Sequence, residues 1–413
     1  MRRYDRWFRL ILPVILFAGL ASASAQELPS NPLLDMLALV PVSAVAAEHE
    51  PIISYADYRA AEAGRGILNP GSRECFLAEQ DKGLWINAMM RLIAGPDLSY
   101  AWQQIQGMPE VVGFDFFAID RALVFGGMPR TGTILAGQFD TAQVGAALAA
   151  RQFERVEYSG VTIWRRFDDL SINIAARDLA DPFGGYIGQA ARIAAIPGGD
   201  GLVYLANSAV DDLTRAMVAA AQDNQALLAD LADYRSLVEA AVDPTRYSGP
   251  LIQASIYSMA TVGLVPGDAG QVLRGTNAPD PTAEYGVLPV YTLAMLADRQ
   301  EGDEEVHLIA LVYTGAEVAR AGAEELANRL RALSVPDAPD DILVERFGST
   351  VTPYVYKSET TGQSVAVVAV RQTGPALGET DEAGMLISQG RLYRLWHSLL
   401  MRRQFSPLWL LTE

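Results

Sequence analysis

The spacing of apolar residues changes along the chain from every second residue, which is typical of strands, to the spacing typical of helices, and back again. This alternation limits the possible folds more than any other feature of the sequence. From residue 114 apolar and polar residues mostly alternate, so Phe114–Ala118 and Thr133–Phe139 are predicted as strands. Asp140 then has the position of a helix N-cap before an amphipathic stretch. The run 153–166, interrupted by Ser159-Gly160, predicts a hairpin with a tight turn. Strands and helices in this order predict an α+β fold.

The same order recurs in the second half of the chain. Strands are predicted over Leu288–Leu296, Val306–Tyr313, Ile342–Phe347, Pro353–Lys357 and Ser364–Arg371. The predicted cap residues Asp140 and Ser208 are 68 residues apart, and Thr314 and Thr380 in the second half are 66 residues apart. We therefore expect two similar halves, each an antiparallel-rich sheet covered by two or more helices. The alternative is two unrelated α+β domains, because the residues themselves barely match.

The N-terminal segment has the three parts of a secretory signal peptide. Four arginines precede the apolar stretch Leu10–Leu20, and Ala23-Ser24-Ala25 provides a small-x-small cleavage site. This predicts an exported protein with a signal peptide over 1–25, periplasmic or extracellular. The alternative is an uncleaved N-terminal membrane anchor, which would be the chain's only contact with a membrane.

Four further regions follow the signal peptide. Residues 26–110 are predicted as a helical lead-in, with short helices after Asn31-Pro32 and over Tyr55–Ala63. The predicted regions are 26–110 for the lead-in, 111–264 for the first α+β half, 265–286 for a linker rich in Gly, Pro, Asp and Asn, and 287–413 for the second half.

Composition excludes several classes of protein. The 413 residues include 49 acidic and 32 basic ones, for a net charge of −17, which argues against nucleic acid as a partner. The single cysteine, Cys75, excludes an intrachain disulfide framework and a cysteine-rich zinc module. We expect Cys75 to be a small buried hydrophobic residue.

One tract resembles a known kind of protein. Leu228-Ala229-Asp230 followed by Tyr234-Arg235 is similar to a tract in uncharacterised bacterial exported families that carry two strand–helix–strand repeats. The resemblance covers about residues 110–240. It implies the fold and brings no activity with it.

Signatures of nucleophilic and nucleotide chemistry are missing from the sequence. It contains no Gly-x-Ser-x-Gly, no Walker A motif and no Gly-x-Gly-x-x-Gly fingerprint. The glycine-rich Gly184–Gly188 is interpreted as a mobile loop. His49, His307 and His397 are far apart, and we expect the last two to be structural, although a three-histidine metal site assembled by the fold stays open.

Carboxylates are abundant but point to no particular reaction. Asp168-Asp169 and Asp211-Asp212 are adjacent pairs, and neighbours on a strand face opposite ways, so they make poor catalytic dyads. The acidic segment 337–341 is expected to be a solvated turn, with a calcium site as the alternative. No catalytic or cofactor-binding residue is therefore nominated.

The expected function is a non-enzymatic exported binding, scaffold or assembly module with no cofactor and an unidentified protein or envelope component as partner. One alternative is an exported carboxylate-dependent hydrolase acting on glycans, with Trp102 and Trp164 as sugar platforms, although we expect both to be core residues. The other is a membrane-tethered subunit of a larger complex.

Overall fold

The computed structural model describes residues 31–46, 52–80, 82–96, 98–222, 225–262, 286–335 and 338–410. The predicted signal peptide 1–25, His49 and the predicted linker 265–286, apart from Gly286, lie outside these residues. Within these described ranges no helix is both long and apolar enough to cross a membrane.

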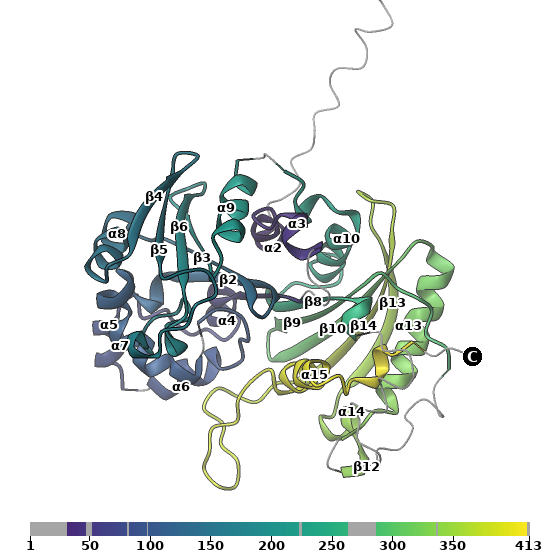
Figure 1. The fold of residues 1–413 in the computed structure, drawn as a ribbon. Helices are drawn as coiled ribbons and strands as arrows, with labels where there is room; N and C mark the ends of the chain where they lie inside the picture. Colours follow the sequence, from purple (N-terminus) through teal and green to yellow (C-terminus); the bar gives the residue numbers. More distant parts are fainter. Residues whose placement is uncertain are drawn as a thin grey trace, which may run out of the picture.

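One antiparallel sheet of twelve strands runs through the molecule (Figure 1). At its middle, β1 (Ile52–Asp57) pairs with β2 on one side and with β8 on the other. Outward from β1 on the first side lie β2 (Ile119–Gly127), β3 (Arg130–Gly137), β7 (Val203–Ser208), β6 (Ala191–Pro197), β5 (Val161–Arg166) and β4 (Glu154–Tyr158). On the second side lie β8 (Leu251–Ser258), β9 (Leu293–Glu301), β10 (Glu304–Tyr313), β14 (Ser364–Thr373) and β13 (Thr350–Lys357).

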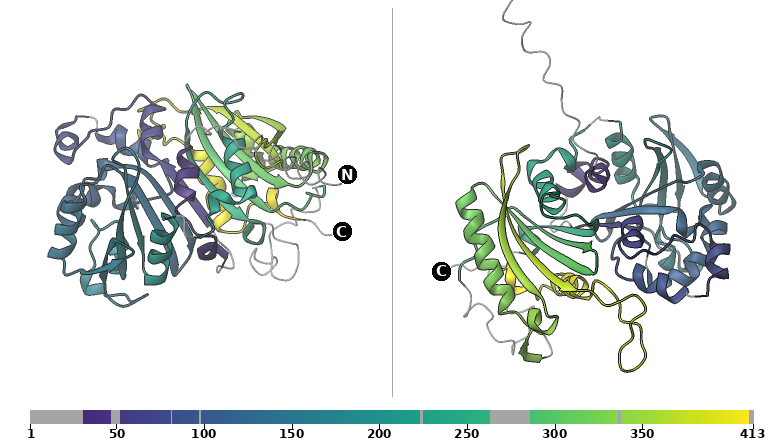
Figure 2. Two further views of the ribbon diagram at one scale, coloured as in Figure 1. Left: turned by 90° about the horizontal axis from the view of Figure 1, so that it is seen from above. Right: turned by 180° about the vertical axis from the view of Figure 1, so that it is seen from behind.

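Helices pack on both faces of this sheet (Figures 1 and 2). The α-helices of the described residues are α2 (Pro32–Leu37), α3 (Val42–Ala46), α4 (Tyr58–Ala63), α5 (Arg73–Ala78), α6 (Lys82–Met89), α7 (Ala101–Val112), α8 (Thr141–Ala150), α9 (Asp211–Ala220), α10 (Ala232–Ala241), α11 (Met259–Val262), α13 (Ala316–Arg331), α14 (Leu343–Arg346) and α15 (Arg391–Met401). A separate two-stranded sheet joins β11 (Ser334–Val335) to β12 (Ala338–Ile342).

The buried apolar residues form three clusters. The first, on one face of the sheet, combines α2, α9 and α10 with strands from both sides of β1. On the opposite face, a second cluster lies under α13 and α15, and a third lies under α4, α6, α7 and α8. The shared first cluster and the continuous ladder make the sheet one structural unit, since burial of apolar area is the main stabilising term.

Elements whose signals come from residues close together in the sequence form as predicted. The Asp140 carboxylate accepts hydrogen bonds from the backbone N–H groups of Ala142 (2.9 Å) and Gln143 (3.2 Å) at the start of α8. The β4–β5 hairpin turns at Ser159-Gly160, where both residues have positive φ, as a tight turn requires. The mixed α+β class and the antiparallel pairing are also as expected, but one sheet of twelve strands stands in place of the two sheets predicted for the two halves.

Elements in the predicted lead-in and in each of the two predicted halves differ from the prediction. The lead-in is not wholly helical, because its residues 52–57 form β1, and the helix predicted from Tyr55 begins at Tyr58. Phe116–Ala118 is a 3-10 turn, and the strand begins only at Ile119. Leu343–Arg346 is the short helix α14 rather than a strand.

Three of the four predicted caps are wrong. The N-caps of α9 and α13 are Val210 and Gly315, neither with a side-chain cap. Thr380 lies between β14 and α15, and α15 begins only at Arg391. The loop that joins these two elements projects from the molecule in Figure 1. There the carboxylate of Asp381 accepts from the N–H groups of Ala383 and Met385 and closes a turn instead of a helix.

Candidate functional site

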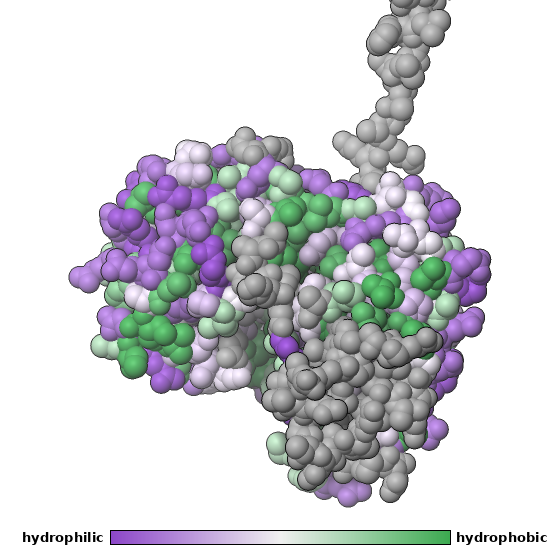
Figure 3. All heavy atoms as spheres, turned by 45° about the vertical axis from the view of Figure 1, so that its right-hand side comes forward, coloured by the Kyte–Doolittle hydropathy of each residue, from purple (hydrophilic) through white to green (hydrophobic). Residues whose placement is uncertain are grey.

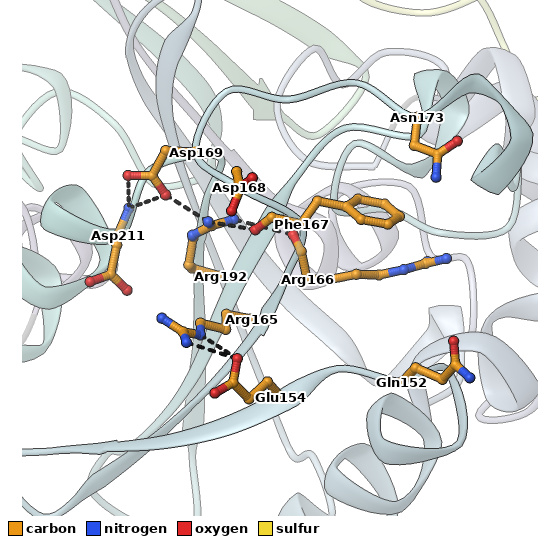
Figure 4. Close-up of a pocket in the computed structure, with 10 residues that line it drawn as sticks. All are labelled: Gln152, Glu154, Arg165, Arg166, Phe167, Asp168, Asp169, Asn173, Arg192 and Asp211. Carbon is orange, nitrogen blue, oxygen red and sulfur yellow. Dashed lines mark hydrogen bonds and ion pairs between the residues drawn. The ribbon is translucent and has the colours of Figure 1, made fainter.

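A polar cleft at the β4–β5–β6 end of the sheet is the candidate functional site (Figure 4). Its volume is about 670 Å³, within the range typical of small-molecule sites. We call it the arginine cleft, and its lining residues are Gln152, Glu154, Arg165, Arg166, Phe167, Asp168, Asp169, Asn173, Arg192 and Asp211.

Arg192 on β6 holds one wall of the arginine cleft in place. Its buried guanidinium contacts the Asp169 carboxylate at 2.6 Å and donates to the carbonyl oxygens of Arg166 (3.2 Å) and Phe167 (2.8 Å). Asp169 also accepts from the backbone N–H of Asp211, the first residue of α9, at 3.3 Å. Arg192 therefore ties the segment after β5 to the sheet and to the start of α9.

Arg166 at the end of β5 differs from the other arginines of the cleft. Its guanidinium lies 4.6 Å from the centre of the Phe167 ring and 5.6 Å from that of Phe153. Partial burial and the neighbouring charge of Arg151 lower the pKa of Arg166. Among the described residues Arg166 forms no ion pair, whereas Arg165 pairs with Glu154 at 2.8 Å. In Figure 4 the Arg166 side chain extends between Asn173 and Gln152, away from the Arg192–Asp169 pair.

The fold brings three of the four flagged aspartates into this cleft. Asp168 and Asp169 lie in the turn after β5, and Asp211 begins α9, so the assumption that they alternate on a strand was wrong. Asp169 is neutralised by Arg192, and Asp211 pairs with Arg215 at 2.5 Å. The fourth, Asp212, lines no part of the cleft and pairs with Arg130. Glu154 also lines the cleft and pairs with Arg165, so three of the four lining carboxylates are held by arginines. The cleft is therefore better suited to binding through Arg166 than to acid–base chemistry.

Sequence reasoning missed Arg166 and Arg192. A signal was present, because β5 ends in Arg165-Arg166 and is followed after one residue by Asp168-Asp169. The partner Arg192 could not be assigned from the sequence, since it depends on the pairing of Arg165 with Arg192 across β5 and β6.

His307 lies in a fully buried ionic cluster. Its Nδ1 is 3.1 Å from Asp298 and its Nε2 is 3.6 Å from Glu305. Arg91 donates two hydrogen bonds to Asp298, at 2.6 and 2.5 Å. The adjacent carboxylates raise the pKa of His307 against the effect of burial, and Arg91 and His307 hold the pKa of Asp298 below its usual range.

His397 on α15 occupies a different environment. Its Nδ1 is 2.6 Å from the hydroxyl of Tyr257, and its ring is stacked on Tyr393. The described residues contain no cluster of three or more potential metal-ligating His, Cys, Asp or Glu side chains.

Replacing His397 with Asn is expected to flatten the pH dependence of stability between pH 4 and 6.5. Burial lowers the pKa of His397 to about 4, below its unfolded value of about 6.5, so the unfolded state binds more protons in this window. The free energy of unfolding therefore rises with pH there, by at most about 1.4 kcal/mol per pH unit from this group. Urea denaturation at several pH values measures the slope. Tyr257→Phe is the control. It is expected to keep the slope, because burial, and not the hydrogen bond to Tyr257, lowers the pKa of His397. An unchanged slope in His397→Asn would contradict the assignment of the pH dependence to His397.

The remaining flagged residues lie elsewhere. Trp164 packs partly buried against the third cluster, and Trp102 is 43 % exposed beside Phe76. Cys75 is exposed, contrary to expectation, because it lies on the outer side of the short helix α5 while Phe76 fills the core. Of the acidic segment 337–341, residue 337 is outside the described ranges and the others belong to β12 rather than to a turn.

The comparisons with known proteins give little beyond this geometry. No family model and no curated protein matches the chain. Among solved structures, crystal form III of TP0453, a bacterial protein, matches at 9 % identity with a TM-score of 0.33, covering 87 % of this chain and 98 % of that one. Crystal form I matches at 8 % identity and 0.33, covering 88 % and 97 %, and form IV at 8 % and 0.30, covering 79 % and 92 %. At these TM-scores the likeness carries no argument about function.

Proposed function

We propose that the chain is an exported, non-enzymatic binding module whose arginine cleft takes a small carboxylate ligand. The observation that carries the proposal is the guanidinium of Arg166, which lies over the rings of Phe153 and Phe167 in a cleft of about 670 Å³ without an ion-pair partner among the described residues. A planar guanidinium matches a carboxylate in geometry and charge, and its positive charge would be compensated by such a ligand.

Neighbouring groups support a small polar ligand. Gln152 and Asn173 line the cleft beside Arg166 and supply uncharged hydrogen-bonding groups. Arg165 and Arg192 already have carboxylate partners in the protein, so Arg166 is the group that a ligand would engage first. Export remains an inference from the segment 1–25, and the envelope partner and the glycan-directed hydrolase stay predictions.

Strand order supports the further proposal that the two sides of the sheet are duplicated. Reading outward from the central pair, one side begins β1-β2-β3-β7-β6 and the other is β8-β9-β10-β14-β13, while the β5–β4 hairpin that ends the first side has no counterpart. A helix follows the third strand on each side, α8 after β3 and α13 after β10. This correspondence replaces the cap spacing as the argument for duplication, since three of the caps were wrong.

Succinate is expected to bind in the arginine cleft, and Arg166→Gln is expected to weaken that binding about tenfold, since a charge-assisted hydrogen bond contributes about 1.5–3 kcal/mol. The measurement is calorimetric titration at constant ionic strength, with neutral succinamide as the matched probe. Arg155→Gln is the control, because Arg155 lies exposed on the neighbouring strand β4 and pairs with Glu157. Equal binding of succinate and succinamide, or no loss in Arg166→Gln, would refute the proposal.

A further inference from the structure

A second cavity lies between α15 and the segment that joins α6 to α7. Its volume is about 370 Å³, within the range typical of small-molecule sites. We call it the histidine cavity, because His397 is the ionisable side chain among its described lining residues. The other side chains that line it are apolar apart from that of the exposed Ser99, and the largest are those of Met90, Leu92, Ile93 and Leu98.

Buried hydrogen bonds hold the wall of the histidine cavity that follows α6. The side chain of Gln253 on β8 accepts from the backbone N–H of Ile93 at 3.1 Å and donates to the carbonyl oxygen of Arg91 at 2.9 Å. The hydroxyl of Tyr58 donates to the carbonyl oxygen of Ala94 at 3.1 Å. This wall is therefore in place before a ligand enters, which lowers the entropic cost of binding.

The next residue of this wall, Gly95, passes close to the sheet. Its φ is +105°, and a Cβ on it would lie 2.6 Å from the hydroxyl oxygen of Tyr58 and 2.8 Å from the Cβ of Ala122, so the backbone can take this path only with glycine. On the opposite side of the cavity, Arg394 of α15 donates to the carbonyl oxygen of Met90 at 2.9 Å. The two walls are thus joined to each other.

The imidazole of His397 is held in one orientation. Its Nδ1 is 2.6 Å from the hydroxyl of Tyr257, and its ring is stacked on that of Tyr393 with an angle of 7° between the two planes. Its Nε2 has no hydrogen-bond partner among the described residues and, unlike both ring nitrogens of His307, it is accessible from outside the protein. Because His397 lines the cavity, Nε2 is the polar atom that a ligand in the cavity can reach.

The neighbouring tyrosine makes Nε2 a hydrogen-bond donor. Burial raises the pKa of Tyr257 and lowers the pKa of His397 to about 4, so both side chains are neutral near neutral pH. Tyr257 is 1 % exposed, and its hydroxyl proton needs an acceptor, which an unprotonated Nδ1 provides. The ring proton of His397 is then on Nε2.

An uncharged ligand suits this cavity. None of its described lining residues is charged, so a charged ligand would lose hydration without gaining an opposite charge. Exposed hydrophobic residues by themselves mark no site on this protein, since on the face in Figure 3 they form patches separated by hydrophilic residues. The histidine cavity differs from such patches because an oriented hydrogen-bond donor lies among its apolar side chains.

We infer that the histidine cavity binds a small uncharged molecule with an apolar body and a carbonyl oxygen, and that this oxygen accepts a hydrogen bond from Nε2 of His397. The apolar body packs against the lining side chains of Met90, Leu92 and Leu98. The site shares no lining residue with the arginine cleft, and the two ligands differ in charge.

An NMR titration with 2-heptanone tests the inference, and 2-methylhept-1-ene, in which a methylene group replaces the carbonyl oxygen, is the matched probe. We expect the ketone to bind saturably and to shift the Nε2 resonance of His397. His397→Phe is expected to weaken ketone binding about five- to tenfold, the contribution of one hydrogen bond, and to leave alkene binding unchanged. His397→Gln, which keeps an N–H donor, is expected to recover part of the ketone binding.

Two control variants locate the effect. Ser398→Ala changes a neighbour of His397 on α15 that does not line the cavity, and Arg166→Gln changes the arginine cleft. Both are expected to bind the ketone as the unchanged protein does. A loss of ketone binding in Arg166→Gln would place the ketone in the arginine cleft and refute the inference.

Three further results would overturn it: neither probe binds saturably; the ketone binds without shifting the Nε2 resonance of His397; or His397→Phe changes the binding of the two probes equally. Should His397→Phe fail to fold because it leaves the Tyr257 hydroxyl without its acceptor, Tyr257→Phe/His397→Phe removes that hydroxyl as well. Leu98→Trp fills the cavity and keeps the imidazole. It is expected to abolish binding of both probes, and undiminished binding in it would equally refute the site.

Discussion

Replacing Arg91 with Met is expected to lower the free energy of unfolding by about 3–5 kcal/mol, the effect of leaving one charge of a buried pair without its partner. Arg91 and Asp298 are 1 % and 0 % exposed, and the two hydrogen bonds between them join the segment after α6 to β9. Met replaces the aliphatic part of the Arg91 side chain and ends before the position of the guanidinium, so the variant removes the charge and the donors together with the packing of the guanidinium group itself. Among the described residues, Asp298 then keeps Gln253, at 2.9 Å, and His307 as its partners.

The double variant Arg91→Met/Asp298→Leu distinguishes the effect of an unpaired buried charge from the effect of lost side-chain packing. Replacing both charges with apolar groups of similar size is often nearly neutral, so it is expected to recover much of the lost stability. Arg155→Met is the control for arginine removal and should change stability by less than about 0.5 kcal/mol, because its pair with Glu157 is exposed. Urea denaturation measures all three. A loss in Arg91→Met no larger than in Arg155→Met would contradict the buried ionic cluster.

Replacing Ile53 with Pro is expected to cost on the order of 3 kcal/mol or more and to destabilise the whole described sheet together. Ile53 lies in β1, which has paired strands on both sides, so proline there removes a ladder hydrogen bond whichever way the N–H points. Its side chain also leaves the first cluster, which includes residues from both sides of the sheet. Unfolding followed by circular dichroism and by tryptophan fluorescence should shift together.

Val355→Pro is the matched control. β13 is an edge strand and already contains Pro353, so the N–H of Val355, two residues further on, points to the open edge. Proline is therefore expected to be much less damaging there. If Ile53→Pro and Val355→Pro cost the same, or if only one side of the sheet melts, β1 does not unite the sheet.

The parts of the fold predictable from sequence are those that neighbouring residues determine. Asp140 caps a helix through N–H groups two and three positions away, and Ser159-Gly160 closes a hairpin between adjacent strands. β1 was missed because Tyr58 continues it into α4 without a break and its partner strand β8 is about 200 residues away. Such pairing leaves no local signal, so the single sheet could not be inferred.

The candidate site also combines residues that the sequence could have indicated with residues that only the fold brings together. Arg166 and Asp168 are close in sequence and could have been noticed as a charged strand end. Arg192 reaches them only through the β5–β6 ladder, and Asp211 only through the start of α9.

The most direct test of the central claim is an NMR titration that follows the side-chain Nε–H resonance of Arg166 as succinate is added. The account predicts a saturable shift of this resonance, absent with succinamide, while that of Arg155 does not move. A resonance of Arg166 that stays unchanged while succinate binds, or while the ligand shifts only residues outside the arginine cleft, would contradict it.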